Sequence, residues 1–173
     1  MSTALKAISV GIIVERRKAS SQWIDYLWRP VAALGGVPQA EPWTVLSQEG
    51  DVTTFYAGAA EVEFFRSATA NYRDNLAGDQ SLWVALRPTE SDPPYSLLAV
   101  TADPSEGESF TETGVDLVEL VPMPDIVRET MIDFVAEHHV EQPFFKRKRD
   151  RADPEAMGRR DPLKDEDAPK DSS

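Results

Sequence analysis

Arginine is the residue type in this sequence best suited to chemistry at a shared site. A guanidinium group presents its N–H donors as a fork that matches a carboxylate or a phosphate. Up to Phe145 the chain has nine basic residues, and four of the five arginines named next fall at or near the ends of expected strands. These candidate anion-binding residues are Arg16, Arg29, Arg66, Arg73 and Arg87. Gathered in one pocket they would hold an anion, whereas apart they would form salt bridges with neighbouring acids.

Other residue types give no catalytic or metal-binding pattern. Cysteine is absent, which removes thiolate metal sites and cysteine nucleophiles. The two histidines, His138 and His139, are adjacent, so on a helix they point about 100° apart, and we expect them to act as favourable charges at a helix C-terminus. Glu61 and Glu63 share one expected strand face, which we expect to be solvated. With no nucleophile elbow and no glycine-rich phosphate loop, the sequence predicts a protein that is not an enzyme and binds no metal or cofactor.

Aromatic residues are concentrated in one expected strand, residues 22–33. Strand alternation places Trp23 on one face and Tyr26 and Trp28 on the other. One of these two sets should therefore face away from the core. Two interpretations follow: a protein-binding surface that uses Trp23, Tyr26 and Trp28, or burial on both faces inside a sandwich.

A second candidate partner-binding segment joins two aromatic residues to a basic run. Its residues are Phe144, Phe145, Lys146, Arg147, Lys148 and Arg149. It can be interpreted as an anchor for a partner, as a nuclear-localisation signal or as the solvated root of a tail. Beyond it the apolar pattern collapses, which predicts one folded domain over residues 1–145 and a disordered charged tail over 146–173.

Apolar periodicity predicts an α+β domain with a mostly antiparallel β-sheet, sandwich or barrel-like, a short middle helix and a C-terminal helix. Ser67 is expected to cap the middle helix, and Pro124 is expected to occupy the first position of the last helix. The expected strands are 8–15, 22–33, 43–48, 52–57, 61–66, 82–87, 95–101 and 115–121, and the expected helical segments are 67–78, 105–110 and 124–139.

Charge is unevenly distributed along the chain. Residues 1–145 carry 9 basic and 22 acidic residues, and residues 146–173 carry 9 basic and 8 acidic residues. An acidic domain repels nucleic acids and anionic membranes and favours basic or polar protein partners. Because no stretch has the composition of a membrane span or a signal peptide, we expect a cytoplasmic protein that binds neither nucleic acid nor membranes.

Several residue strings form a recognisable pattern along the chain. The strings are Val14-Glu15-Arg16-Arg17-Lys18, Trp23-Ile24-Asp25-Tyr26-Leu27-Trp28-Arg29-Pro30-Val31, Tyr72-Arg73-Asp74-Asn75-Leu76, Val84-Ala85-Leu86-Arg87, Val100-Thr101-Ala102-Asp103-Pro104, Val121-Pro122-Met123-Pro124 and Phe144-Phe145-Lys146-Arg147-Lys148-Arg149. Together they resemble a proteobacterial family, a domain of unknown function typically encoded beside formate dehydrogenase genes. The resemblance covers roughly residues 8–150.

The resemblance implies an accessory of a molybdenum- or tungsten-dependent formate dehydrogenase. Some similar proteins are labelled as molybdopterin-guanine-dinucleotide biosynthesis proteins, but the glycine-rich nucleotide loop of such a transferase is missing here. We therefore expect a non-catalytic accessory that binds a formate dehydrogenase subunit during assembly or cofactor loading. The alternatives are a small-molecule module whose arginine cluster holds the phosphates of the pterin cofactor, and a permanent small subunit of the enzyme complex.

Overall fold

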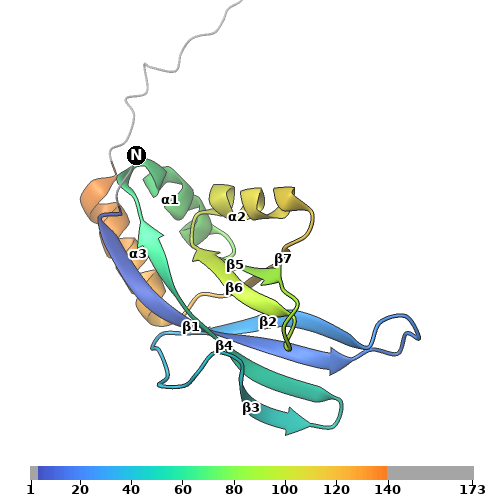
Figure 1. Cartoon of the computed structure of the whole chain (residues 1–173). Coiled ribbons are helices and arrows are strands. Elements are labelled where there is room, and N and C mark those ends of the chain that lie inside the picture. Colours follow the sequence, from blue (N-terminus) through green and yellow to red (C-terminus); the bar gives the residue numbers. More distant parts are fainter. Residues whose placement is uncertain (1–3, 140–173) are drawn as a thin grey trace, which may run out of the picture. The chain divides into compact units, whose positions relative to one another are not determined.

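Two antiparallel sheets and three α-helices make up residues 4–139, the part of the chain that the computed structural model describes (Figure 1). The predicted α+β class, with mostly antiparallel strands, a middle helix and a C-terminal helix, is confirmed. The basic-aromatic segment from Phe144 to Arg149 and the tail predicted for 146–173 lie outside the described residues.

The larger sheet has the strand order β2-β1-β4-β3. Its strands are β1 (Lys6–Lys18), β2 (Tyr26–Leu34), β3 (Thr44–Glu49) and β4 (Val52–Phe64). The prediction of two separate strands over 52–57 and 61–66 is wrong, because β4 runs through both. A register shift opposite Ile12 and Ile13 leaves an extra residue beside Gly58, whose φ of 129° is accessible to glycine. This bulge lets the strand continue.

The smaller sheet has the order β6-β5-β7, with β5 (Ser81–Pro88) in the centre and β6 (Tyr95–Thr101) and β7 (Leu117–Pro122) at the edges. Strand β2 lies beside β7, and β4, whose second half extends past its pairing with β3, lies beside β6, so the two sheets approach each other on two sides. Side chains from the inner faces fill the space between them, which gives the domain a barrel-like core.

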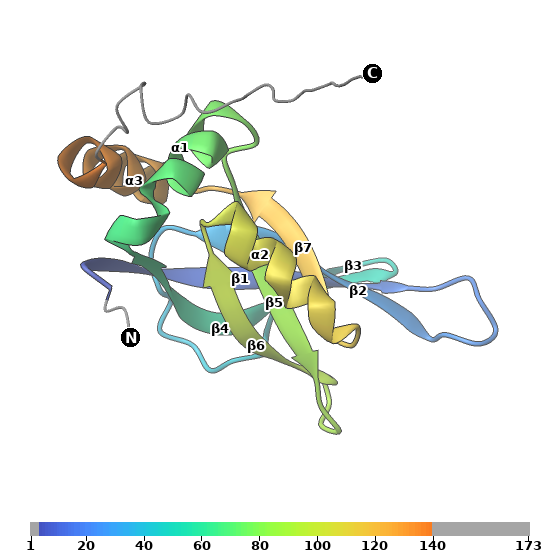
Figure 2. The ribbon, with the colours of Figure 1, turned by 90° about the horizontal axis from the view of Figure 1, so that it is seen from above.

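The helices are α1 (Thr69–Ala77), α2 (Pro104–Phe110) and α3 (Asp125–His138). Figures 1 and 2 show α1 beside α3, and α2 over β5 and β6. Two expected helix starts are wrong. Ser67 lies inside a 3₁₀ turn (Arg66–Ala68) and does not cap α1, and Pro124 is the extended N-cap residue of α3, one position before the helix.

Three elements supply half of the buried core cluster, and in each the buried residues recur at the spacing that places them on the core-facing side. They are Val10, Ile12 and Val14 of β1, Leu82, Val84 and Leu86 of β5, and Val127, Met131 and Phe134 of α3. Burying each of the aliphatic side chains contributes roughly 1.5–3 kcal/mol. Helix α2 approaches β5 closely at Gly107, where an added Cβ atom would overlap the indole ring of Trp83.

Strand length distinguishes the two sheets. Strands β1 and β4 have 13 residues each, whereas β5, β6 and β7 have 8, 7 and 6. At about 3.3 Å per residue, a difference of five residues is roughly 16 Å. The larger sheet therefore extends beyond the smaller one, and its far end has no second sheet across from its inner face (Figure 2).

Candidate partner-binding site

The far end of the β1–β2 hairpin, residues 15–29, projects from the domain, and we call it the β1–β2 arm (Figures 1 and 2). Its strands stay paired to their ends, where Lys18 lies opposite Tyr26. The Ala19 N–H donates to the Asp25 carbonyl oxygen at 3.0 Å, and the Lys18 N–H donates to the Asp51 carbonyl oxygen at 3.0 Å. These bonds make the arm a paired ribbon that is tied to the β3–β4 turn.

The tip of the arm exposes large apolar side chains. Trp23 is 84% exposed, Leu27 is 54% exposed and Ile24 is 50% exposed. Among residues 4–139, the Trp23 indole has no ring contact or hydrogen bond, and only the backbone N–H is bonded, to Ser21 Oγ at 3.0 Å. When a partner covers a tryptophan that is exposed to water in this way, the burial of its ring favours binding.

The strand predicted over 22–33 begins only at Tyr26, so Trp23 lies before it. Strand β2 starts at Tyr26, and residues 19–25 form the connection because the register pairs Lys18 with Tyr26. Trp23 is therefore in the connecting loop and not on a strand face. The outward residue of β2 at this position is Leu27.

Trp28 lies on the inner face of the sheet. Its cross-strand partner is Arg16, two residues beyond the buried Val14, so both side chains project toward the core side. The indole stacks on Phe55 with a centroid distance of 5.6 Å and an interplanar angle of 29°. It also contacts Tyr95 at 5.8 Å and Trp43 at 6.3 Å. Trp28 thus belongs to an aromatic cluster at the place where the larger sheet extends beyond the smaller one.

Arg16 lies against the outer rim of this aromatic cluster. Its guanidinium carbon is 4.4 Å from the centroid of the Tyr26 ring, 5.3 Å from Phe55 and 5.7 Å from Trp28. Arg16 Nη2 donates to Thr53 Oγ1 at 3.3 Å. Within residues 4–139 no carboxylate lies within ion-pair distance of this guanidinium, so most of its N–H donors have no protein acceptor there.

A pocket of about 410 Å³ opens beside Arg16. Its walls come from the arm and from the loop between β5 and β6, and the lining residues are Arg16, Asp25, Tyr26, Trp28, Asp92 and Pro94. The pocket thus combines one guanidinium, two carboxylates and two aromatic rings. Such a set can hold a charged and partly apolar group.

The five candidate arginines are not gathered at one site. On the outer face of the arm, Arg29 lies 3.6 Å from Glu15, which is also 3.4 Å from Arg17. Arg87 of β5 binds Asp116 through two hydrogen bonds of 2.9 and 3.1 Å. These bonds and the opposite charges hold the pKa of Asp116 below, and that of Arg87 above, the ordinary values. Arg29 and Arg87 therefore form local salt bridges.

The remaining two arginines are near α1. Arg66 is exposed in the 3₁₀ turn. Arg73 lies with its Nη1 2.8 Å from Nε2 of His139, whose Nδ1 is 2.9 Å from Thr69 Oγ1. Because a guanidinium can only donate, Nε2 is the acceptor and Nδ1 carries the proton. The His139 ring thus joins α1 to the end of α3, and His138 is the basic residue in the last turn of α3.

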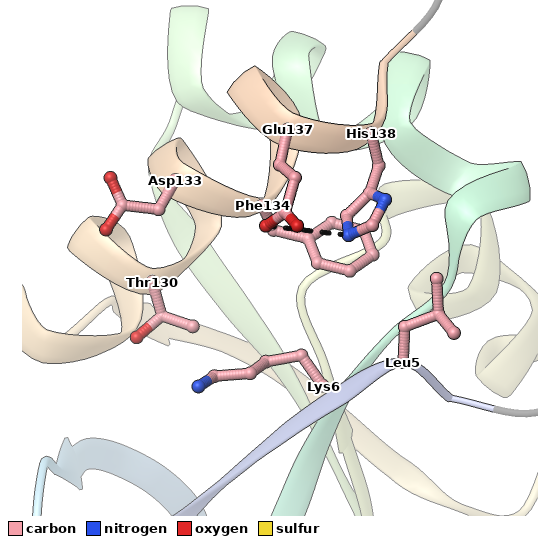
Figure 3. Close-up of a pocket in the computed structure, with 7 residues that line it drawn as sticks. All are labelled: Leu5, Lys6, Thr130, Asp133, Phe134, Glu137 and His138. Carbon is pink, nitrogen blue, oxygen red and sulfur yellow. Dashed lines mark ion pairs between the residues drawn. The ribbon is translucent and has the colours of Figure 1, made fainter.

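A second pocket, of about 250 Å³, lies between the start of β1 and the last turns of α3 (Figure 3). Its lining residues are Leu5, Lys6, Thr130, Asp133, Phe134, Glu137 and His138. His138 Nε2 is 3.7 Å from Glu137 Oε1, and the imidazole packs on the Phe134 ring with a centroid distance of 4.5 Å. Phe134 also packs against the core residues Phe64 and Tyr72, so this wall of the pocket is structural.

Among residues 4–139, no three histidine, aspartate or glutamate side chains are placed together to hold a metal ion. None of the helices described here is long and apolar enough to cross a membrane.

Residues 9–149 match the family model described as "Protein of unknown function (DUF3305)", so the chain belongs to this family. The matched region begins inside β1 and includes the whole β1–β2 arm and the aromatic cluster. No curated protein and no solved structure matches the chain.

Sequence reasoning missed several members of the site. Thr53, Phe55, Tyr95 and Asp92 come from β4, β6 and the β5–β6 loop, and nothing in their local sequence marks them. Arg16 is already among the sequence candidates, and the buried alternation of Val10, Ile12 and Val14 continues to position 16 and places this arginine on the core-facing side.

Proposed function

We propose that the chain is a non-catalytic protein-binding accessory whose β1–β2 arm contacts the partner. The observation that carries this proposal is the cluster of Trp23, Ile24 and Leu27 on a projecting ribbon, each at least half exposed. Tryptophan is among the residues that dominate binding energy at protein interfaces. The resemblance to proteins encoded beside formate dehydrogenase genes supplies the partner class: the accessory acts in the cytoplasm and binds a formate dehydrogenase subunit during assembly or cofactor loading.

Replacement of Trp23 tests this proposal. Affinity-tagged protein is purified from cells that express the dehydrogenase, and the retained proteins are identified and quantified by mass spectrometry. We expect Trp23→Ala to reduce the retained dehydrogenase subunit about tenfold or more, since a central interface tryptophan contributes roughly 2 kcal/mol. Val115→Ala is the matched control, because Val115 is 66% exposed at a different surface position.

The control and the wild-type protein should retain the same subunit in equal amounts. Recovery of no dehydrogenase subunit or assembly factor by the wild type, together with unchanged dehydrogenase activity in a deletion strain, would contradict the proposal. If Trp23→Ala retained as much dehydrogenase subunit as the wild type, the two proteins would associate through a surface other than the β1–β2 arm.

A permanent small subunit is the second candidate, and it uses the same exposed surface. Size-exclusion chromatography separates the two, because a permanent subunit stays with the enzyme in a fixed stoichiometry and a transient accessory dissociates on dilution. The pterin-phosphate alternative required the five arginines to share one pocket. Its geometric support is missing, because Arg29 and Arg87 are engaged with Glu15 and Asp116.

A further inference from the structure

Charge on the β1–β2 arm is opposite to charge on the rest of the domain. The arm carries four basic residues, Arg16, Arg17, Lys18 and Arg29, and two acidic residues. The rest of residues 4–139 carries five basic and nineteen acidic residues. At physiological ionic strength charges interact over about 8 Å. A partner that touches the projecting arm therefore meets a positive surface, although the domain as a whole is acidic.

The cations of the arm differ in whether they are already neutralised. On the outer face, Arg17 and Arg29 share Glu15. On the inner face, Arg16 and Lys18 have no carboxylate within ion-pair distance among the described residues. Arg16 is the more constrained of these two, because the rings of Tyr26, Trp28 and Phe55 and the hydroxyl of Thr53 fix its guanidinium group. It is thus a preorganised donor at the edge of a pocket.

We infer that Arg16 binds a carboxylate of an acidic segment of the protein partner, while Trp23 enters an apolar depression on the same partner. This inference rests on the proposed function and adds the chemistry of the partner. A guanidinium held by aromatic rings can present two parallel N–H groups to a single carboxylate.

The two aspartates of the pocket decide which anion fits. Asp25 and Asp92 line the same pocket as Arg16. A phosphate with nearly two negative charges would face both carboxylates, and a nucleic acid would also face the nineteen acids of the body. A single aspartate or glutamate side chain carries half that charge, and the peptide N–H groups beside it can donate to Asp25 or Asp92.

Site-specific cross-linking tests the inference on the full-length protein. A photoreactive phenylalanine analogue replaces Trp23, or Val115 as the control, in cells that express the dehydrogenase, and mass spectrometry identifies the cross-linked peptide. We expect cross-linking from position 23 and none from position 115. The captured segment should contain aspartate or glutamate within a few residues of apolar ones.

Variants of Arg16 examine the carboxylate contact in the same assay. Arg16→Met keeps the packing of the side-chain stem, and Arg16→Lys keeps the charge but not the fork. We expect both to lower the cross-linking yield, by about tenfold for methionine, as for loss of a charge-assisted hydrogen-bonded pair. Arg128→Met, which removes an arginine paired with Asp125 on α3, should have no effect. If thermal melting shows that an Arg16 variant is poorly folded, Lys18→Gln replaces it in the assay. This variant removes the other inner-face cation of the arm at an exposed position.

Competition with defined polyanions separates carboxylate from phosphate recognition. Poly-L-glutamate should reduce the cross-linking yield at concentrations where single-stranded DNA does not. Equal competition by DNA would overturn the inference, and so would unchanged cross-linking in Arg16→Met and Lys18→Gln, or a captured segment without acidic residues. In each of these cases cross-linking from position 23 would still support the proposed function. Its complete absence would count against the proposed function itself.

Discussion

The hydroxyl group of Tyr72 is buried where α1 meets the end of β4. It accepts a hydrogen bond from the Phe65 N–H at 2.9 Å and lies 3.4 Å from the Glu63 carbonyl oxygen, to which it donates. Burial raises the pKa of Tyr72 from 10.0 to about 12, and the bond from Phe65 opposes this rise. The phenol therefore stays protonated in the folded protein under conditions where an unfolded tyrosine loses its proton.

This pKa shift makes the free energy of unfolding depend on pH. Since the folded state holds the proton more tightly, the stabilisation is complete below pH 10 and is lost as pH rises toward about 12. A shift of about two units corresponds to roughly 2–3 kcal/mol. Denaturant unfolding measured along an alkaline pH series should show this loss for the wild type.

Tyr72→Phe is the matched variant for the same series. It should cost about 1–2 kcal/mol at neutral pH, because the Phe65 N–H loses its acceptor. Above pH 10 its stability should fall less steeply than that of the wild type. Parallel pH curves for the two proteins would show that another group causes the alkaline loss.

Single residues also show how far sequence reasoning reaches. Alternation along β1 is a local property, so it correctly places Val10, Ile12 and Val14 inward and extends to Arg16. The rings that surround Arg16 depend on pairing with β2 and β4 and on the approach of Tyr95. Such contacts form only when distant segments meet, and one sequence without its fold does not specify them.

Among the secondary-structure elements, helix α1 is held in place by one buried side chain, that of Asn75. The Asn75 side-chain amide donates to the carbonyl oxygens of Ser81 and Ala102 at 2.9 and 2.8 Å, and its Oδ1 accepts from the Ser81 N–H at 3.1 Å. One side chain thus joins α1 to the start of β5 and the end of β6. Asn75 is only 3% exposed, so water does not readily replace these bonds.

Asn75→Ala should lower the free energy of unfolding by about 2–4 kcal/mol, because one buried and two partly buried backbone groups lose their partner. Thermal melting and denaturant titration measure this loss. Asn71→Ala is the control on the same helix, since Asn71 makes one partly buried bond to Asp103 at 3.0 Å. It should cost about 1 kcal/mol or less. Equal losses in the two variants would mean that the contacts of Asn75 do not hold the elements together.

Element boundaries were predicted best where periodicity was strong and worst where turn geometry decided them. The helix over 124–139 is confirmed within one residue at each end, because its apolar rows repeat for four turns. The break expected between residues 57 and 61 is absent, because the bulge at Gly58 absorbs the irregularity. The aromatic neighbours of Trp23 predict a strand there. However, the connection after β1 passes through Ser20 and Ser21, and pairing with β1 resumes only at Tyr26.

Over the whole molecule, the distribution of charge gives salt two opposite effects. The chain carries a net charge of −12, and residues 4–139 outside the arm contribute most of the acids. Self-repulsion among these carboxylates destabilises the compact state, while the positive arm attracts the acidic partner segment that we infer. The Debye length falls from about 30 Å at 0.01 M to about 8 Å at 0.15 M ionic strength. Both interactions are weakened across that range.

We therefore expect sodium chloride, added from about 0.01 to 0.15 M, to raise the melting temperature of the protein and to weaken its association with the partner. Differential scanning calorimetry measures the first effect, and the dissociation constant of the purified pair measures the second. Sucrose is the control, since exclusion from the protein surface raises the melting temperature without screening charge and should leave the association intact. If salt tightened the association instead, apolar contact at Trp23 would dominate and the carboxylate on Arg16 would have no measurable role. A weakening that Arg16→Met abolishes would assign the salt dependence to this single guanidinium.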